Sequence, residues 1–244
     1  MQPAPQDGAP LPCLHLWVDP TPRRGYLNMA LDEALLRRPE AWLRVYGWAL
    51  PAVSYGYFDT RDVAEGLAPG AREYIRRWTG GGIVDHRRGQ TYTLTLPARQ
   101  PGEAAYPESA CLYARIHRAL AEVLSGGGTP CDLLAQDAAD GGRACWSSPV
   151  TADIVTPSGN KLAGAAQRRS GGAVLHQGMV QGCELPPGWE TALAQALAEE
   201  VLLHTAEEPV PGLLQEAEAL CRNKYEAPAW QDESHGRRRS HPSL

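Results

Sequence analysis

The chain of 244 residues lacks several features that mark common classes of protein. No apolar run approaches the ~20 residues that a membrane-spanning helix needs. The residues before Pro12 lack the basic stretch and apolar run of a secretory signal. The net charge of −5 excludes a globally basic protein that coats nucleic acid. We therefore expect a cytoplasmic protein that contacts neither nucleic acid nor a membrane.

Closely spaced cysteines are also missing. The six cysteines include no CxxC pair and no other metal-ligand spacing, so we expect no bound metal. In the cytosol they should be free thiols. Cys145 is treated separately below, and the others are expected to be structural: Cys13, Cys111, Cys131, Cys183 and Cys221.

Helix and strand patterns are mixed along the chain without regular βαβ spacing. Apolar residues recur at helical spacing over 27–35, 112–123, 191–203 and 213–220. Strand patterns occupy two segments within 43–58, a half-buried strand at 91–96, a hairpin of 153–155 with 161–167, and 173–175. This mixture predicts an α+β fold with mixed or antiparallel sheets packed against helices. We expect one domain at 11–227, a flexible tail at 1–10 and a flexible basic tail at 228–244.

Three consecutive glycines form the sharpest local motif, within the stretch RRWTGGGIVDH at 76–86. Glycines let backbone N–H groups approach an anion, and arginines suit carboxylates or phosphates. The pattern predicts an anion- or acyl-binding loop, with an ordinary glycine turn beside surface arginines as an equally supported alternative. It is no Walker loop, because the Gly-Lys-Ser/Thr ending is missing.

A lysine among small residues forms the second motif, KLAGAAQR at 161–168. Lys161 in such surroundings can point into a pocket and stabilise negative charge on a reacting carbonyl or phosphate. The alternative is a solvated lysine at the start of a strand. Gly164 and Ala165 permit close approach by backbone or ligand.

The third feature is Cys145, in the segment Ala-Cys-Trp at 144–146. A cysteine nucleophile needs a lowered thiol pKa, which nearby cations provide. Lys161 follows 16 residues later, close enough for a hairpin to bring the two together. Taken alone, a cysteine is more often an inert buried thiol.

Together these motifs resemble one family. Residues 13–225 look like the catalytic domain of lipoate-protein ligases and octanoyltransferases, which is related to biotin-protein ligases. The matching segments occur in order at 28–33, 43–48, 53–57, 76–86, 161–168 and 176–178. The resemblance implies the α+β fold of that domain, with Cys145 and Lys161 as catalytic residues. The substrate-binding residues that it implies are Arg76, Arg77, Thr79, Gly80, Gly81, Gly82, His86, Gly164, Ala165 and His176.

Two chemistries occur in the family that the chain resembles. Ligases activate a free acid with ATP and magnesium and form an acyl-adenylate. Octanoyltransferases take octanoate from acyl carrier protein through an acyl-cysteine and need no cofactor. Both deliver the acyl group to a lysine of a lipoyl-domain protein, such as the glycine cleavage H protein or a 2-oxoacid dehydrogenase E2.

Three features favour the octanoyltransferase. The segment around Cys145 resembles the one that carries the nucleophile in ligase-like transferases. Ala152-Asp153 stands where similar ligases usually have Asn-Asp. Only 64 residues follow Val180, so we expect no fused accessory domain of the kind that many ligases carry or require. An ATP-dependent ligase, a lipoyl amidotransferase and a non-catalytic binder of acyl groups or lipoyl domains remain the alternatives.

The expected mechanism follows from this resemblance. The Cys145 thiolate attacks the octanoyl thioester, Lys161 holds the thiolate and orients the carbonyl, and backbone N–H groups near Gly80–Gly82 position the reacting group. The acceptor lysine then attacks the acyl-cysteine, which requires a base. His86 is a candidate, and a structural histidine is the equally supported alternative.

A basic face is also expected, because acyl carrier proteins and lipoyl domains are commonly acidic. The arginines expected to form it are Arg76, Arg77, Arg87, Arg88, Arg168 and Arg169.

Overall fold

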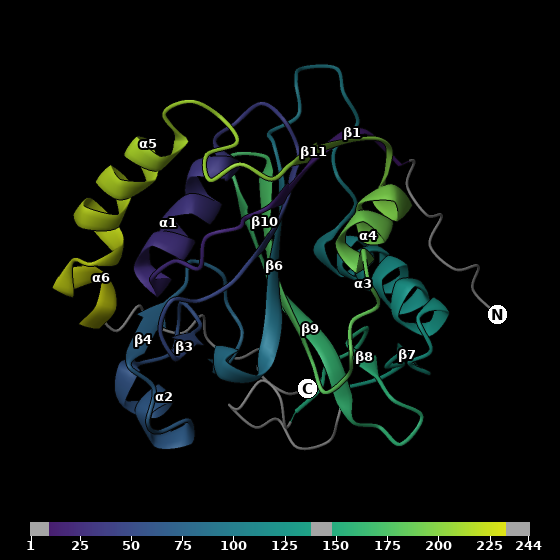
Figure 1. Ribbon diagram of the computed structural model, residues 1–244, viewed down its shortest axis with the longest axis horizontal. Helices are drawn as coiled ribbons and strands as arrows, with labels where there is room; N and C mark the ends of the chain where they lie inside the picture. The colour runs from purple at the N-terminus through teal and green to yellow at the C-terminus, as the bar shows by residue number, and fades with distance from the viewer. Residues whose placement is uncertain (1–9, 138–147, 233–244) are drawn as a thin grey trace, which may run out of the picture.

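An eight-stranded sheet forms the centre of the fold. The computed structural model describes residues 10–137 and 148–232, and Figure 1 shows how its elements are arranged. The strand order is β11-β1-β2-β6-β10-β9-β8-β7. Strand β1 runs parallel to β11 and β2, and the other neighbouring pairs are antiparallel. The strands are β1 (Leu11–Val18), β2 (Trp42–Tyr46), β6 (Gly89–Leu96), β7 (Asp132–Leu133), β8 (Ile154–Val155), β9 (Lys161–Ser170), β10 (Ala173–Gln181) and β11 (Ala198–His204).

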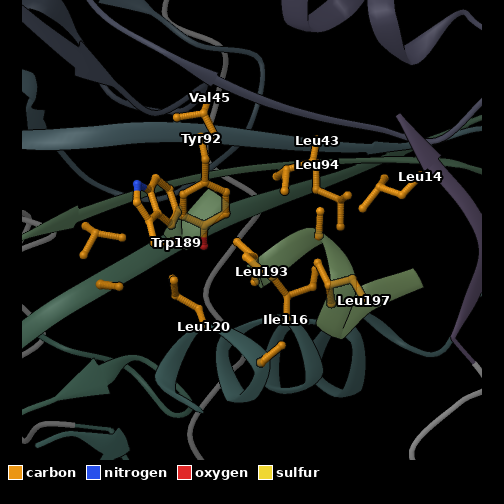
Figure 2. Close-up of a cluster of buried hydrophobic side chains, with 14 of the residues drawn as sticks. Leu14, Leu43, Val45, Tyr92, Leu94, Ile116, Leu120, Trp189, Leu193 and Leu197 are labelled. Carbon is orange, nitrogen blue, oxygen red and sulfur yellow. The ribbon is translucent and has the colours of Figure 1, made fainter. Parts of the chain in front are cut away.

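Helices cover both faces of this sheet (Figure 1). One face packs against α3 (Ser109–Gly126) and α4 (Trp189–Leu197), and the other against α1 (Gly25–Leu36), which in turn packs against α5 (Leu213–Leu220). Figure 2 shows the core on the α3 side, where Leu43 and Leu94 of the sheet face Ile116 and Leu193 of the helices. The fold is therefore α+β with a mixed sheet, as the sequence predicts.

A second, three-stranded sheet lies beside α1 and carries the glycine motif. Its order is β4-β3-β5, formed by β4 (Glu73–Arg76), β3 (Ala52–Tyr55) and β5 (Val84–Asp85). Helix α2 (Arg61–Leu67) packs against β3 and β4. A 3₁₀ turn (His86–Arg88) then leads directly into β6. The three glycines thus connect β4 to β5, and β5 leads back to the large sheet.

The hairpin β9–β10 carries the lysine motif into the centre of the sheet. Ser170 pairs with Ala173, so the turn consists of Gly171 and Gly172, which both have positive φ (56° and 86°). Two-residue hairpins favour such backbone angles, which glycine adopts without strain. This turn fixes the register that places Gly164 opposite Met179.

The helix expected over 191–203 is wrong in its second half. Helix α4 ends at Leu197, and residues from Ala198 onward form β11, parallel to β1. The apolar pattern continues through this segment, but pairing with β1 decides its conformation, because tertiary context overrides local propensity. Sequence reasoning also missed β1, α2 and β4.

The expected half-buried strand at 91–96 is buried on both faces. Tyr92, Leu94 and Leu96 belong to the core on the α3 side. The alternate residues Thr91, Thr93 and Thr95 are also at most 3% exposed, since they lie on the face that α1 covers. Polar side chains on this face suggested solvent. Instead, Thr91 accepts from Trp48 Nε1 and Thr93 donates to Asp32, whereas Thr95 Oγ1 has no hydrogen-bond partner among the described residues.

The expected tail at 228–244 is wrong at its start. Residues Pro228–Asp232 form helix α6, and Gln231 is only 6% exposed. Its side chain donates to Tyr225 O (2.6 Å) and accepts from Arg76 N (3.0 Å), so internal hydrogen bonds hold the segment in place. Within residues 10–137 and 148–232, no helix has the length and apolarity to cross a bilayer.

Candidate functional site

A narrow pocket lies between α1, the large sheet and the small sheet. Its cavity volume is about 30 Å³, and it is partly open to the surface; this is room for about two water molecules. A larger ligand must displace side chains, and the flexible thioethers of Met29 and Met179 are suited to move. The lining residues are Met29, Tyr46, Ser54, Arg77, Val84, His86, Thr91, Gly164, Ala165, Ala166, Gln177, Gly178 and Met179. The pocket therefore brings together Arg77, His86, Gly164 and Ala165 of the predicted site.

Arg77 holds the glycine loop from inside. Its guanidinium donates to Gly80 O (2.6 Å), to Gly82 O (2.8 Å) and to Ser54 Oγ (3.2 Å). Gly81 has a φ of 82°, and a Cβ on Gly56 would lie 1.9 Å from Gly81 O, so both positions require glycine. Arg77 is only 4% exposed, and most of its N–H donors bond to the loop rather than being offered to a ligand.

Arg76 lies outside the pocket. It is fully buried and donates to Tyr57 O (2.6 Å), Asp59 O (2.8 Å) and Gln231 O (3.1 Å). These contacts join the loop after β3 to the C-terminal helix α6. The geometry thus makes Arg76 a structural residue that supports the glycine loop.

The expected basic face is wrong for Arg76 and Arg77, because both are buried. Arg87 is exposed but pairs with the Asp85 carboxylate (2.6 Å), which neutralises its charge locally. The positions that expose charge in this set are therefore chiefly Arg88 and Arg169.

Thr79 connects the glycine loop to a chain of buried polar groups. Its hydroxyl donates to Gln177 Oε1 (2.8 Å), and Gln177 Nε2 donates to Asp32 Oδ2 (2.7 Å). The same carboxylate accepts from Tyr46 OH (3.0 Å) and Thr93 Oγ1 (2.8 Å). Gln177 and Tyr46 both line the pocket, so this chain fixes two sides of its wall.

Arg44 supplies the positive charge that balances the buried Asp32 carboxylate in this hydrogen-bonded network. Its guanidinium, fully buried, pairs with Asp32 (3.0 Å) and Asp19 (2.8 Å) and donates to Asn28 Oδ1 (2.7 Å). Burial raises the pKa of Asp32 above its usual value, while the charge of Arg44 acts in the opposite direction. A buried carboxylate that accepts from four donors is stable only with this arrangement complete.

His86 stacks on Trp48 at a ring-centroid distance of 4.0 Å. Its two ring nitrogens lie 2.8 Å from Ser54 Oγ and 3.1 Å from Thr91 Oγ1. Burial and the nearby charge of Arg77 lower the pKa of His86 to about 3. A ring with both nitrogens engaged and so low a pKa is a weak base. The geometry favours the structural interpretation of His86.

Lys161 rests against the wall of the pocket. Its Nζ lies 2.7 Å from Asp153 Oδ2, and the two side chains are 2% and 0% exposed. A Cβ on Gly164 would lie 2.4 Å from this Nζ, so only glycine leaves room for the ammonium there. The need for a small residue at Gly164, which the sequence indicates, is therefore steric.

Cys145 lies outside the described residues, so its position relative to Lys161 stays a prediction. The described residues on either side of 138–147 are joined, since Asp137 accepts from Thr151 N (2.7 Å) and Thr151 Oγ1 (2.6 Å). Just beyond, Val150 N donates to Asp153 Oδ2 (2.8 Å). Both described flanks of that segment thus lie close to the Lys161–Asp153 pair.

His176 is not brought to the pocket. It follows Leu175 and precedes Gln177 on β10, and adjacent side chains of a strand point to opposite faces. Its ring lies 5.6 Å from that of Tyr113 and 5.7 Å from that of His117 on α3. Burial lowers the pKa of His176 well below its usual value, so the ring is neutral near pH 7.

Several residues at the site were not assigned a role from the sequence. The only sequence signal for four of them was that they stand within the segments that resemble the family: Asp32, Arg44, Ser54 and Gln177. For Thr91, there was no sequence signal other than its place in the expected strand at 91–96. Among the described residues, no group of three or more His, Cys, Asp or Glu side chains could hold a metal ion.

Solved structures of other proteins share this fold. A bi-partite lipoate protein ligase of Thermoplasma acidophilum is 16% identical, with a TM-score of 0.60 over 96% of this chain and 100% of that chain. Lipoate-protein ligase A, solved with bound ATP, is 17% identical, with a TM-score of 0.60 over 91% of this chain and 98% of that chain. The chain thus has the fold of the lipoate-protein ligases.

The family model for the lipoyl protein ligase A/B catalytic domain matches residues 24–182. The chain belongs to this family, which confirms the resemblance seen in its motifs. Curated relatives named Octanoyltransferase LipM occur in Moorella thermoacetica and Kyrpidia tusciae. Both are 34% identical over 169 residues, covering 64% and 63% of this chain and 60% of each relative. The chain spans about 60% of the length of these relatives.

Replacing Arg44 tests the buried network. Arg44→Met leaves Asp32 without a counter-charge, so we expect the free energy of unfolding to fall by about 3–5 kcal/mol. Arg61→Met removes an exposed pair with Glu65 (48% and 44% exposed) and should cost no more than about 0.5 kcal/mol. Urea unfolding of both variants measures the difference, and equal costs would contradict the network's role.

The pKa of His86 predicts how stability depends on pH. Because the folded pKa is about 3 and the ordinary value 6.5, unfolding takes up a proton between these pH values. This contribution to stability is present above pH 6.5 and is lost as the pH falls toward 3. At pH 5, His86→Asn should lower the proton uptake on unfolding by about one. Urea unfolding across pH 4.5–5.5 gives that uptake; an unchanged value would mean that His86 titrates normally in the folded protein.

Proposed function

We propose that the protein is an octanoyltransferase of the lipoate pathway. It takes the octanoyl group from the thioester of acyl carrier protein and passes it to a lysine of a lipoyl-domain protein. The observation that carries this proposal is the buried Lys161–Asp153 pair against Gly164 at the pocket wall. The relatives named octanoyltransferases, up to 34% identical, support this reaction type. The bi-partite lipoate protein ligase of Thermoplasma acidophilum, which was studied together with its E2 lipoyl domain, supports the acceptor class.

Cys145 is the nucleophile in this mechanism. Its thiolate attacks the thioester carbonyl, a new C–S bond forms, and the carrier thiolate leaves and takes up a proton. The neutral amine of the acceptor lysine then attacks the acyl-cysteine. An amide forms, the amine loses a proton, and the Cys145 thiolate is regenerated. No cofactor is consumed, because the energy of one thioester is carried into the next.

The Lys161 ammonium has an electrostatic role in both steps. A cation beside the nucleophile lowers the pKa of the thiol and stabilises negative charge on the carbonyl oxygen. Asp153 keeps this ammonium at the pocket wall, next to Gly164. The acyl chain occupies the pocket after Met29 and Met179 move aside.

The test is the intact mass of the protein after mixing with octanoyl-acyl carrier protein without ATP. We expect an octanoyl adduct that hydroxylamine removes, because thioesters are labile to it. Cys145→Ala should abolish the adduct, whereas Cys131→Ala, which removes a half-buried thiol elsewhere, should retain it.

A parallel reaction with lipoate, ATP and a lipoyl domain tests the competing chemistry. Lipoylation that needs ATP and survives Cys145→Ala, without any adduct from the carrier protein, would overturn the proposal in favour of a ligase. Binding of either substrate without turnover would overturn it in favour of a non-catalytic binder.

A further inference from the structure

Helix α3 contacts the candidate site from behind through two side chains one turn apart. Tyr113 OH donates to Asp153 Oδ1 (2.5 Å) and accepts from Ala165 N (2.9 Å). His117 Nδ1 lies 2.7 Å from Ala152 O. Positions i and i+4 share one face of a helix, so both side chains reach the same dipeptide.

The dipeptide Ala152–Asp153 is held in an unfavourable conformation. Ala152 has a φ of 66°, which among non-glycine residues is uncommon and strained. Its backbone groups are all bonded: Ala152 N donates to Leu134 O, Asp153 N to Val150 O, and Leu134 N to Asp153 O. The remaining carbonyl, Ala152 O, is the one that His117 holds. Such strain persists only where the surroundings fix it.

The Asp153 carboxylate is consequently fixed from three directions. Tyr113 binds one oxygen, while Val150 N (2.8 Å) and Lys161 Nζ (2.7 Å) bind the other. Since no side chain of Gly164 intervenes, this carboxylate can hold the ammonium of Lys161 at the pocket wall.

Burying the His117 side chain costs free energy, because one of its polar ring nitrogens has no partner among the residues that the structure describes. The ring is fully buried, and its Nε2 has no hydrogen-bond partner within the described part of the chain. Burial lowers the pKa of His117 to about 4, so it is neutral near pH 7 and carries its proton on Nδ1, toward Ala152 O. An apolar residue would avoid the unsatisfied nitrogen. The hydrogen bond to Ala152 therefore accounts for a histidine here.

We propose that Tyr113 and His117 are positioning residues: they fix Ala152–Asp153, and Asp153 in turn holds Lys161 at the reacting centre. This inference deepens the proposed octanoyl transfer and rests on it for its catalytic meaning. Neither side chain lines the pocket. They act on the reaction only through the aspartate, and the placement of Lys161 can be measured without any turnover.

The placement of Lys161 can be measured by chemical labelling of amines, because the chain has few lysines. The sequence contains two lysines, Lys161 and Lys224. Lys224 pairs with Glu33 of α1 rather than with Asp153, and its side chain is 21% exposed. Its acylation by an amine-reactive ester is therefore an internal reference. A general loss of stability raises labelling of both lysines, whereas release of Asp153 raises it at Lys161 alone.

Tyr113→Phe should raise the Lys161/Lys224 labelling ratio about fivefold, because Asp153 loses a charge-assisted hydrogen bond. Tyr106→Phe, which removes a half-buried hydroxyl outside the site, should leave the ratio unchanged. Peptide mass spectrometry over a labelling time course gives the ratio. An unchanged ratio in Tyr113→Phe overturns the role of Tyr113.

Two amide variants test His117. Asparagine places its amide near the position of Nδ1 and can still donate to Ala152 O, whereas glutamine places it nearer Nε2. We expect His117→Asn to keep the wild-type labelling ratio and His117→Gln to raise it about fivefold. Equal ratios in the two variants would overturn the role of His117.

Kinetics then separate positioning from binding. In Tyr113→Phe and His117→Gln, the maximal rate of acyl-enzyme formation should fall about tenfold, with half-saturation by octanoyl-acyl carrier protein within about twofold of the wild type. A changed half-saturation at unchanged maximal rate overturns the positioning role. If the wild type forms no adduct, the proposed function fails, while the labelling ratios still decide whether these residues place Lys161.

Discussion

The buried charge of Arg44 is the constraint on which the rest of the pocket depends. A guanidinium without solvent requires carboxylates, and Asp19 and Asp32 provide them. Asp32 in turn requires hydrogen-bond donors for its remaining lone pairs. One residue on each of three neighbouring strands provides them: Tyr46, Thr93 and Gln177. Gln177 orients Thr79 at the start of the glycine loop. One buried cation thus links α1, the large sheet and the loop that closes the pocket.

This dependence explains which parts of the molecule could be predicted from sequence. The glycine loop and the lysine segment were visible because glycine and small residues leave a local signature, and the structure gives Gly81 and Gly164 specific backbone or steric reasons. The resemblance marked the segments that hold Asp32, Arg44 and Gln177 but assigned them no role. Their role arises from contacts between distant segments, which no local pattern contains.

Other features depended on tertiary contacts alone. The segment after Leu197 has a helical apolar pattern, yet it forms a strand because β1 offers an edge to pair with. Arg76 and Arg77 looked like surface charges for a partner, but backbone carbonyls of nearby loops take up their donors. Tyr113 and His117 are polar positions of an amphipathic helix, and only the fold brings them to Ala152 and Asp153.

The pocket and the Lys161 pair are supported from opposite sides. The Arg44 network fixes the wall formed by Tyr46 and Gln177, and α3 fixes the aspartate that holds Lys161. Fixed polar groups beside two flexible methionines, Met29 and Met179, suit the acyl-chain binding that we propose for this pocket. In the proposed mechanism, Cys145 reacts at a site whose other polar groups are held in place by the fold.

The most direct test of this account is a crystal structure of the protein carrying an octanoyl group. We expect the chain to run from the Cys145 sulfur into the pocket between Gly164 and Gln177, with Met29 or Met179 displaced. The contacts from Arg44 through Asp32 to Gln177 and Thr79 should be unchanged. An acyl chain bound elsewhere, or a network rearranged by its binding, would contradict the account.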